Sequence, residues 1–192
     1  MDDRLYNTLK WVAIALGLAW VTWAFYDAFL RSEHPHAIGL ETGNKYFADG
    51  YYEQALAEFE SILHEDPQNF DALRGVARSL MQLGRNEAAL RAFDDVIARQ
   101  PEFGPAYANR GILNDRMANY RAAIRDYEKA AALDAELNEG PHWLTRFLRN
   151  QPEQQATIVE RARYLRAQLA LPEDQRVLRV PEMDARQRPY DQ

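Results

Sequence analysis

The stretch FDALRGVARSLMQLGRNEAALRAFDDVIARQPEF, residues 70–103, decides the fold, because its neighbours on both sides repeat its pattern at intervals of 34 residues. A small residue, an alanine, an aromatic residue and a proline recur in phase. They are Gly43, Ala77 and Gly111; Ala55, Ala89 and Ala123; Phe59, Phe93 and Tyr127; and Pro67 and Pro101. A fixed period of this length is typical of solenoids built from paired helices.

Each recurring residue type suits a pair of antiparallel helices. Two helices approach closely only where the side chains between them are small, which accounts for the glycine and alanine positions. The aromatic residue follows the recurring alanine of the second helix by four positions. It therefore lies on the same helical face and fills space between neighbouring helix pairs. Pro67 and Pro101 mark turns, since proline cannot occupy a helix interior. Gly50 and Gly84 are expected just after the first helix of their pairs.

These residues resemble the tetratricopeptide repeat, a family of helix-turn-helix solenoids. The matching positions are Gly43, Tyr46, Ala55, Phe59 and Pro67 in residues 36–69; Leu73, Ala77, Leu80, Gly84, Ala89, Phe93 and Pro101 in 70–103; and Tyr107, Gly111, Ala123, Tyr127 and Ala130 in 104–137. Asn114 and Ala135 depart from the motif. The resemblance implies an all-α fold with three repeats over residues 36–137.

The resemblance also implies a concave surface, lined mainly by the first helix of each repeat, on which partner proteins bind. The residues expected to face this groove are Asn44, Phe47, Arg74, Arg78, Met81, Gln82, Asn109, Ile112, Asp115 and Arg116. Arg74 and Arg78 lie four positions apart on one helical face, so together they suit a carboxylate or an acidic peptide. Pairing with local acids, or simple solvation, is the alternative interpretation of these two arginines.

Some relatives grip a partner's C-terminal carboxylate with a set of lysine, asparagine and arginine residues. Asn44 lies in a comparable place, but Leu40 stands where the lysine would be expected. The full clamp is therefore absent, which disfavours recognition of chaperone C-terminal tails.

Beyond residue 137 the repeat register is lost. Residues 141–149 and 154–170 have helical patterns, and we expect 138–171 to form a degenerate fourth repeat or a cap, because terminal repeats must cover an exposed apolar face. In the second pattern, Arg161 falls outside the apolar face. Residues 172–192 contain three prolines and no glycine, which predicts an extended tail. Within it, residues 176–183 are interpreted either as a docking segment or as a solvated tail.

The N-terminal region contains a long apolar segment. Residues 11–26 carry no charge, and counted to Leu30 the segment has 20 residues, or about 30 Å of helix, which matches a bilayer core. A cleavable signal peptide would need small residues after the apolar segment, which are missing. A buried core helix would show a polar face, and only Thr22 is polar here. We therefore expect residues 1–35 to form a membrane anchor and linker that contacts lipid through residues 11–30.

Basic residues predict the orientation of this anchor. Arg4, Lys10 and the α-amino group precede the apolar segment, whereas Arg31 alone follows it closely. The positive-inside rule then places the N-terminus in the cytoplasm. By similarity of layout to anchored repeat proteins of bacteria, we expect a single-pass inner-membrane protein with periplasmic repeats.

Composition excludes several function classes. The 192 residues include 23 Lys and Arg, 29 Asp and Glu, four His and no Cys, for a net charge of −6. The acidic balance argues against a nucleic-acid binder, and the missing cysteines exclude thiol chemistry and Cys-ligated metals. The chain has no phosphate-binding loop, no nucleophile elbow and no zinc-protease motif. We therefore expect no catalytic, metal or cofactor site.

These observations predict a non-catalytic, membrane-anchored scaffold that binds partner proteins, as an assembly factor or accessory component of a membrane or envelope complex. The alternative is a structural subunit held in a larger membrane complex mainly through its transmembrane helix, where Ala13, Gly17 and Ala24 would allow close helix packing. An enzyme is the third hypothesis, and it has no site to support it.

Overall fold

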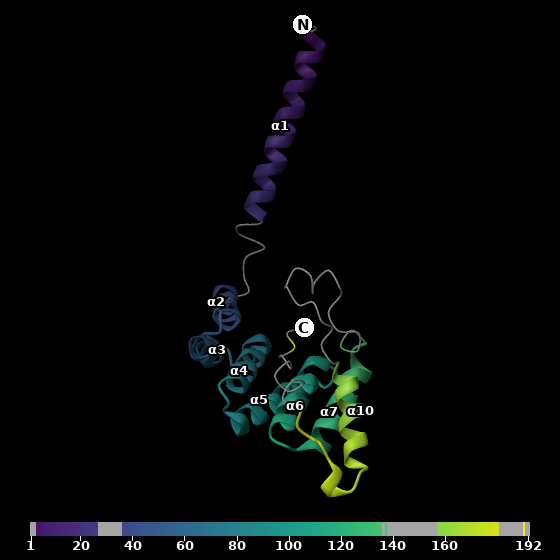
Figure 1. Cartoon of the computed structure of the whole chain (residues 1–192). Helices are drawn as coiled ribbons and strands as arrows, with labels where there is room; N and C mark the ends of the chain where they lie inside the picture. The colour runs from purple at the N-terminus through teal and green to yellow at the C-terminus, as the bar shows by residue number, and fades with distance from the viewer. Residues whose placement is uncertain (1–2, 27–35, 136, 138–156, 181–189, 191–192) are drawn as a thin grey trace. The chain divides into compact units, whose positions relative to one another are not determined.

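A computed structural model of the chain describes residues 3–26, 36–135, 137, 157–180 and 190. Within these ranges it contains eight α-helices, one 3-10 helix and no strand. The chain divides into two compact units, Met1–Ile38 and Gly39–Gln192, which we describe separately. The expected all-α solenoid is confirmed (Figure 1). The helix expected over residues 141–149 lies outside the described residues.

The first unit contains helix α1, Asp3–Phe25, whose large apolar side chains are exposed. Residues Tyr6–Phe25 are long and apolar enough to cross a bilayer, and none of them is buried within the protein. The Thr22 hydroxyl donates a hydrogen bond of 2.7 Å to the Leu18 carbonyl, so the polar group of this apolar segment is satisfied inside the helix. Residues 27–30, expected to extend the lipid contact, lie outside the described part.

The second unit contains three successive helix pairs. They are α2 (Ala37–Ala48, which begins in the first unit) with α3 (Tyr52–Glu65), α4 (Phe70–Gln82) with α5 (Asn86–Arg99), and α6 (Gly104–Arg116) with α7 (Tyr120–Leu133). Each pair occupies one 34-residue repeat of the sequence.

The residues that define the sequence period form the core. Ala55, Ala89 and Ala123 are fully buried, as are Phe59 and Tyr127, and Phe93 is 2% exposed. The small residues opposite them are required by close approach. A Cβ on Gly43 would lie 2.7 Å from the Phe59 ring, and one on Gly111 would lie 2.7 Å from the Tyr127 ring. The periodic small and aromatic positions are therefore one packing arrangement used three times.

The turn inside each helix pair uses a left-handed residue at the same repeat position. Gly50 has φ of 82° and Gly84 has φ of 71°. The third repeat has Ala118 at this place, with φ of 62°. An L-residue with a Cβ is disfavoured there, whereas glycine adopts this conformation readily. The two glycine turns were expected from the sequence, whereas the strained alanine was not.

Helix α10, Ile158–Leu169, packs on α7 (Figure 1). It begins with a capping box, because Thr157 Oγ1 accepts from the Glu160 N–H and the Glu160 carboxylate accepts from the Thr157 N–H. After the 3-10 helix η2, Glu173–Gln175, the chain runs back along α10. The Val177 carbonyl accepts from Tyr164 Oη at 2.7 Å, and the Val177 N–H donates to Gln168 Oε1 at 2.8 Å.

Candidate partner-binding groove

Helix α4 presents two arginines beside aromatic rings. The helix begins after Asn69, whose side chain accepts a hydrogen bond from the Ala72 N–H. One turn further on, the Arg74 guanidinium carbon lies 4.9 Å from the centre of the Phe103 ring and 5.7 Å from that of Phe70. Asp71 is 3.7 Å from the Arg74 guanidinium and is largely exposed. Arg74 is therefore held by ring contacts and by a weak, solvated ion pair.

Arg78 joins the first two repeats. Its Nη2 donates to Asn44 Oδ1 at 3.1 Å, and its guanidinium carbon lies 4.6 Å from the centre of the Phe47 ring. Asn44 and Arg78 occupy the same position in successive repeats, since they are 34 residues apart. Of the ten residues expected to face the groove, Asn44, Phe47 and Arg78 are thus brought together by α2 and α4.

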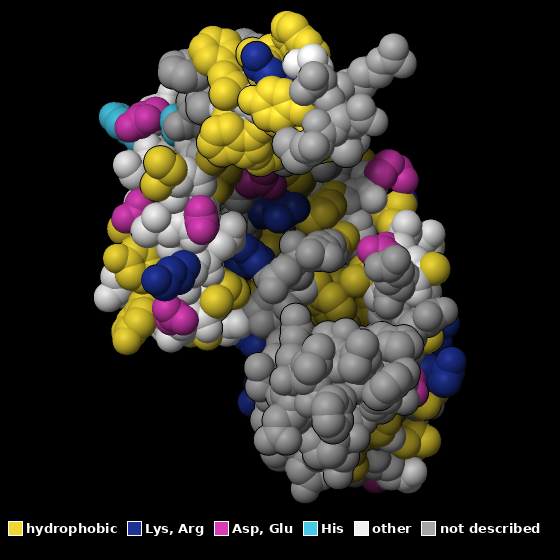
Figure 2. All heavy atoms as spheres, turned by 90° about the horizontal axis from the view of Figure 1, so that it is seen from above, with side chains coloured by type: hydrophobic (Ala, Val, Ile, Leu, Met, Phe, Trp, Pro, Cys, Tyr) yellow, Lys and Arg dark blue, Asp and Glu magenta, His cyan; other side chains and the backbone are white. Residues whose placement is uncertain are grey.

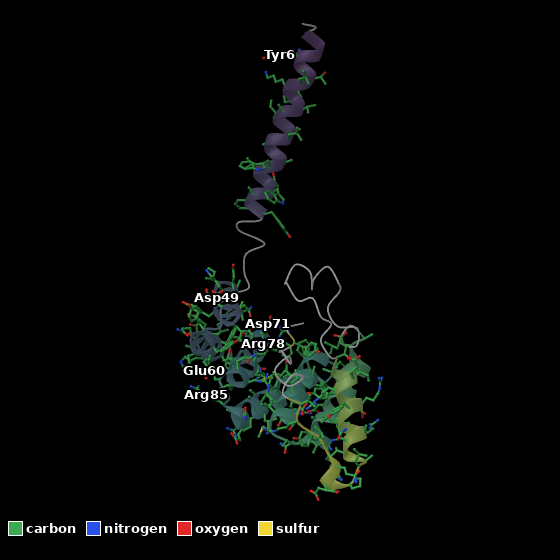
Figure 3. The ribbon with its side chains drawn as sticks, viewed as in Figure 1. Tyr6, Asp49, Glu60, Asp71, Arg78 and Arg85 are labelled. Atoms are coloured by element: carbon green, nitrogen blue, oxygen red, sulfur yellow. The ribbon has the colours of Figure 1, made fainter. Side chains whose placement is uncertain are left out.

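The surroundings of Arg78 disfavour its positive charge. Burial is the main reason that its pKa falls from 12.5 to about 10, and the charge of Arg74 lowers it further, against a smaller opposing effect of Asp71. Asp71 and Arg78 lie on the inner side of the array, whereas Glu60 and Arg85 lie on its outer side (Figure 3). An anion that reached both arginines would restore the electrostatic stabilisation that burial removes.

Arg74 and Arg78 also line a small hollow that continues to α6. Its other lining residues are Phe93, Val96, Phe103, Ala106, Asn109 and Tyr190. In the space-filling view, basic side chains lie recessed among hydrophobic ones near the centre (Figure 2). A surface of this composition suits a segment that has both an apolar and an acidic character.

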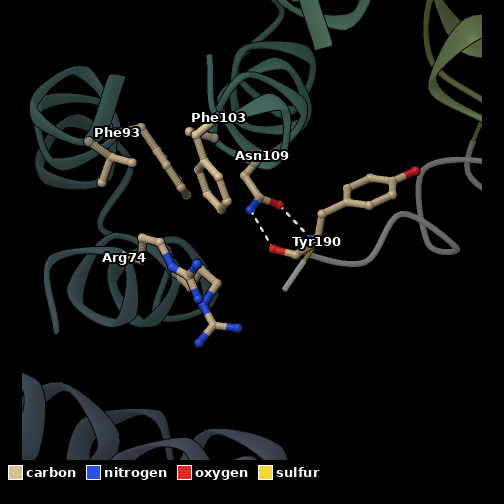
Figure 4. Close-up of a pocket in the computed structure, with 8 residues that line it drawn as sticks. Arg74, Phe93, Phe103, Asn109 and Tyr190 are labelled. Atoms are coloured by element: carbon tan, nitrogen blue, oxygen red, sulfur yellow. Dashed lines mark hydrogen bonds between the residues drawn. The ribbon is translucent and has the colours of Figure 1, made fainter. Parts of the chain in front are cut away.

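The Asn109 side chain binds the backbone of Tyr190 in the chain's own tail. Its Nδ2 donates to the Tyr190 carbonyl at 2.8 Å, and its Oδ1 accepts from the Tyr190 N–H at 2.7 Å (Figure 4). Asn109 is 2% exposed. Asn109 was expected in the groove, but the sequence carries no signal for its contact with Tyr190, because the two residues are 81 positions apart.

Asp115 lies in a buried cluster that joins α6, α7 and α10. It accepts two hydrogen bonds from Arg161, at 2.7 and 2.9 Å, and one from Tyr127 Oη at 3.2 Å. Burial, followed by the charge of Asp115, raises the pKa of Tyr127 well above 10. Asp115 was expected to face a partner, and instead α10 covers it. Arg161 was expected on the polar face of its helix and is buried, because Asp115 provides a carboxylate for it.

The remaining predicted residues are distributed between core and surface. Met81 and Ile112 were expected to face the groove, but they are 1% and 2% exposed and belong to the hydrophobic core, where burial of their apolar side chains is favourable. Gln82 is half-buried and Arg116 is exposed, and the Arg116 carbonyl accepts from Arg179 at 3.4 Å. Of the predicted set, Arg74, Arg78 and Asn109 line the hollow, and Asn44 and Phe47 contact Arg78.

Among the described residues there is no group of three or more metal-ligating side chains. The ionisable groups of the groove are arginines and acids in contacts with neighbouring side chains.

Sequence comparisons agree with this geometry. Residues 46–109 and 104–137 each match the tetratricopeptide repeat family. Residues 46–137 are tetratricopeptide repeats. The repeats begin in α2 and end after α7, so they include the arginines of α4 and Asn109 of α6.

Two curated proteins have similar repeats. The chain is 34% identical over 101 residues to DnaJ homolog subfamily C member 7 homolog of Dictyostelium discoideum, and 32% identical over 95 residues to RNA polymerase II-associated protein 3 of Xenopus laevis. Each match covers 50% of this chain, but only 19% and 14% of those relatives. The likeness therefore concerns the repeats and not the whole proteins.

A solved structure has the same repeat fold. The first TPR of Spaghetti (RPAP3), bound to the HSP90 peptide SRMEEVD, superimposes with a TM-score of 0.50 at 24% identity. The match covers 60% of this chain and 89% of that one. This similarity supports the fold of the repeats.

Proposed function

We propose that the chain is a non-catalytic scaffold whose tetratricopeptide repeats bind an acidic segment of a partner protein. The observation that carries this proposal is the pair of arginines on α4, held by aromatic rings beside a hollow. Arg78 retains its charge at neutral pH although its pKa is lowered to about 10. A partner carboxylate between Arg74 and Arg78 would form charge-assisted hydrogen bonds. That a relative of the same fold holds the acidic peptide SRMEEVD supports this choice of ligand.

Charge reversal tests the groove. The full chain is affinity-purified from detergent extract, and the partner protein recovered with it is quantified by mass spectrometry. The double variant Arg74→Glu, Arg78→Glu should reduce the amount of partner protein recovered at least tenfold. The matched control is Arg91→Glu, Arg121→Glu, which changes the net charge equally at two exposed positions outside the groove. Equal recovery with both double variants would refute a role for the α4 arginines.

We further propose that α1 anchors the scaffold in a bacterial inner membrane, with its N-terminus in the cytoplasm and the repeats in the periplasm. The exposed apolar surface of residues 6–25 supports an anchor, and the excess of Arg4 and Lys10 over Arg31 supports the orientation. Removal of residues 1–31 should release the protein from membranes. An enzyme reporter that is active only in the periplasm, fused after Gln192, should be active, and an inactive reporter would reverse the topology.

In this setting the scaffold would act as an assembly factor or accessory component of a membrane or envelope complex. The alternative role, a structural subunit held by its transmembrane helix, is favoured by one feature of α1. A Cβ on Gly17 would meet no atom within 4 Å among the described residues of the first unit, so no packing described there requires this small residue. Loss of the complex on Gly17→Leu, with retention in the arginine variant, would favour the alternative.

A further inference from the structure

The tail of the chain contacts the groove through its backbone. Tyr190 exchanges two hydrogen bonds with the buried Asn109 amide, at 2.7 and 2.8 Å, which are optimal lengths. The preceding described part of the tail is attached to the same side of the repeats, because Arg161 of α10 donates to the Leu178 carbonyl at 3.1 Å and Arg179 donates to the Arg116 carbonyl of α6. Two separate parts of the tail therefore contact α6, at Asn109 and at Arg116.

The Asn109 contact recognises backbone and not a particular side chain. The Asn109 side-chain amide donates to the Tyr190 carbonyl and accepts from the Tyr190 N–H. An extended strand presents the same pair of backbone groups to a neighbouring segment. The Tyr190 ring points away from Arg74 and Phe103 (Figure 4). Any extended segment with an N–H at this place can satisfy Asn109, and a buried asparagine that loses the tail needs such a replacement.

We propose that Tyr190 acts as an intramolecular ligand of the repeats, in which its backbone occupies the place of a partner's backbone at Asn109, so that a partner must displace Tyr190 to bind. This inference rests on the proposed function, because the Asn109 site that Tyr190 occupies belongs to the proposed partner-binding groove. The arginines of α4 line the same hollow as Tyr190, and their charges suit an acidic side chain of the displacing segment. The displacing segment is therefore expected to be extended and acidic.

The expected size of the effect follows from mass action. A tethered segment competes at an effective concentration of roughly millimolar. If the docked state of the tail is populated about tenfold more than the free state, the apparent affinity of a competing segment falls about tenfold. A change of this size is measurable with a peptide added to the full chain.

The tail residue itself provides the test, because changing it leaves the repeat core intact. Tyr190→Pro removes the N–H that Asn109 accepts, whereas the control Tyr190→Phe keeps the backbone and the ring. The probe is a fluorescein-labelled peptide of residues 184–192, DARQRPYDQ, titrated by anisotropy into the detergent-solubilised full chain. We expect the Tyr190→Pro protein to bind this peptide at least fivefold more tightly than the wild type and the Tyr190→Phe protein. Equal affinity of all three proteins, or absence of binding to Tyr190→Pro, would overturn the proposal.

Hydrogen exchange gives a second, partner-independent measurement. The Tyr190 amide should exchange at least tenfold more slowly in the full chain than in the free 184–192 peptide, and equal rates would overturn docking of the tail. If docking is observed but Arg74→Glu, Arg78→Glu leaves partner recovery unchanged, the proposed function fails while the docked tail remains. The two failures are thus distinguishable.

Discussion

Asp115 on α6 and Arg161 on α10 form a bidentate ion pair in which both side chains are only 3% exposed. The pair connects the third repeat to α10, and Arg161 also donates a hydrogen bond to the Leu178 carbonyl of the tail. A single buried guanidinium therefore links the third repeat, α10 and the tail. This arrangement makes the end of the solenoid sensitive to one substitution.

Arg161→Met should destabilise the protein by about 3–5 kcal/mol, because it leaves the Asp115 carboxylate buried without its cation. Urea unfolding followed by circular dichroism measures the loss. The matched control is Arg163→Met, an exposed arginine on the same helix, which should change stability by less than about 0.5 kcal/mol. Similar values for the two variants would mean that the pair has no net structural role.

Ala118→Gly should stabilise the protein by about 1 kcal/mol, because Ala118 has φ of 62° at a position where the other two repeats have glycine. The unfolding midpoint in urea should rise. Ala57→Gly, in the middle of α3, serves as the control and should cost about 1 kcal/mol, since glycine is unfavourable inside a helix. A decrease in stability for Ala118→Gly would show that the left-handed turn is not maintained in solution.

Gly75→Ala should destabilise the repeats by about 1–3 kcal/mol through overpacking, despite the higher helix propensity of alanine. The added Cβ would lie 2.5 Å from Phe59 ring atoms, so the ring must move. Combination with Phe59→Leu should recover part of the loss caused by Gly75→Ala, which a double-mutant cycle detects. Additive effects of the two substitutions would contradict a direct contact.

The contribution of Tyr127 to stability should fall as the pH rises above about 10, because Tyr127 has a raised pKa in the folded state. Between the unfolded and folded pKa values the folded protein binds more protons, so the free energy of unfolding decreases with pH, by up to about 1.4 kcal/mol per unit for this group. Below pH 10 the contribution is fully present. Tyr127→Phe should show a shallower decrease above pH 10 in urea unfolding.

The lowered pKa of Arg78, about 10, acts in the opposite direction above pH 10, because there the unfolded state binds more protons. This contribution is common to the wild type and Tyr127→Phe, so the difference between the two proteins reports Tyr127. Identical slopes would show that the Tyr127 hydroxyl does not stay protonated in the folded protein.

The fold could be predicted from the sequence because its information is local and repeated. Ala55, Ala89 and Ala123 recur at 34 residues, and each is fully buried between the helices of its pair. Such a pattern is visible without knowledge of any long-range contact. The same reasoning found Arg78 and Asn44, which are equivalent residues of neighbouring repeats.

The rest of the groove could not be predicted, because it depends on contacts between distant segments. Asp115 resembled a surface acid until α10 placed Arg161 against it, 46 residues further along the chain. Tyr190 lies in a proline-containing tail with no periodic pattern, so only its docked position reveals that it contacts Asn109. Met81 and Ile112 share their repeat positions with groove residues, but as apolar side chains they are buried.

The location of Tyr190 has a practical consequence for anyone who purifies this protein. Only two residues would separate Tyr190 from a tag or fusion attached after Gln192. The bulk and charge of the tag would then weaken the hydrogen bonds between Tyr190 and Asn109. Baits tagged at that end and baits tagged within the loop after α5 would then recover different sets of proteins. The position of the affinity tag would therefore affect which partner proteins are recovered.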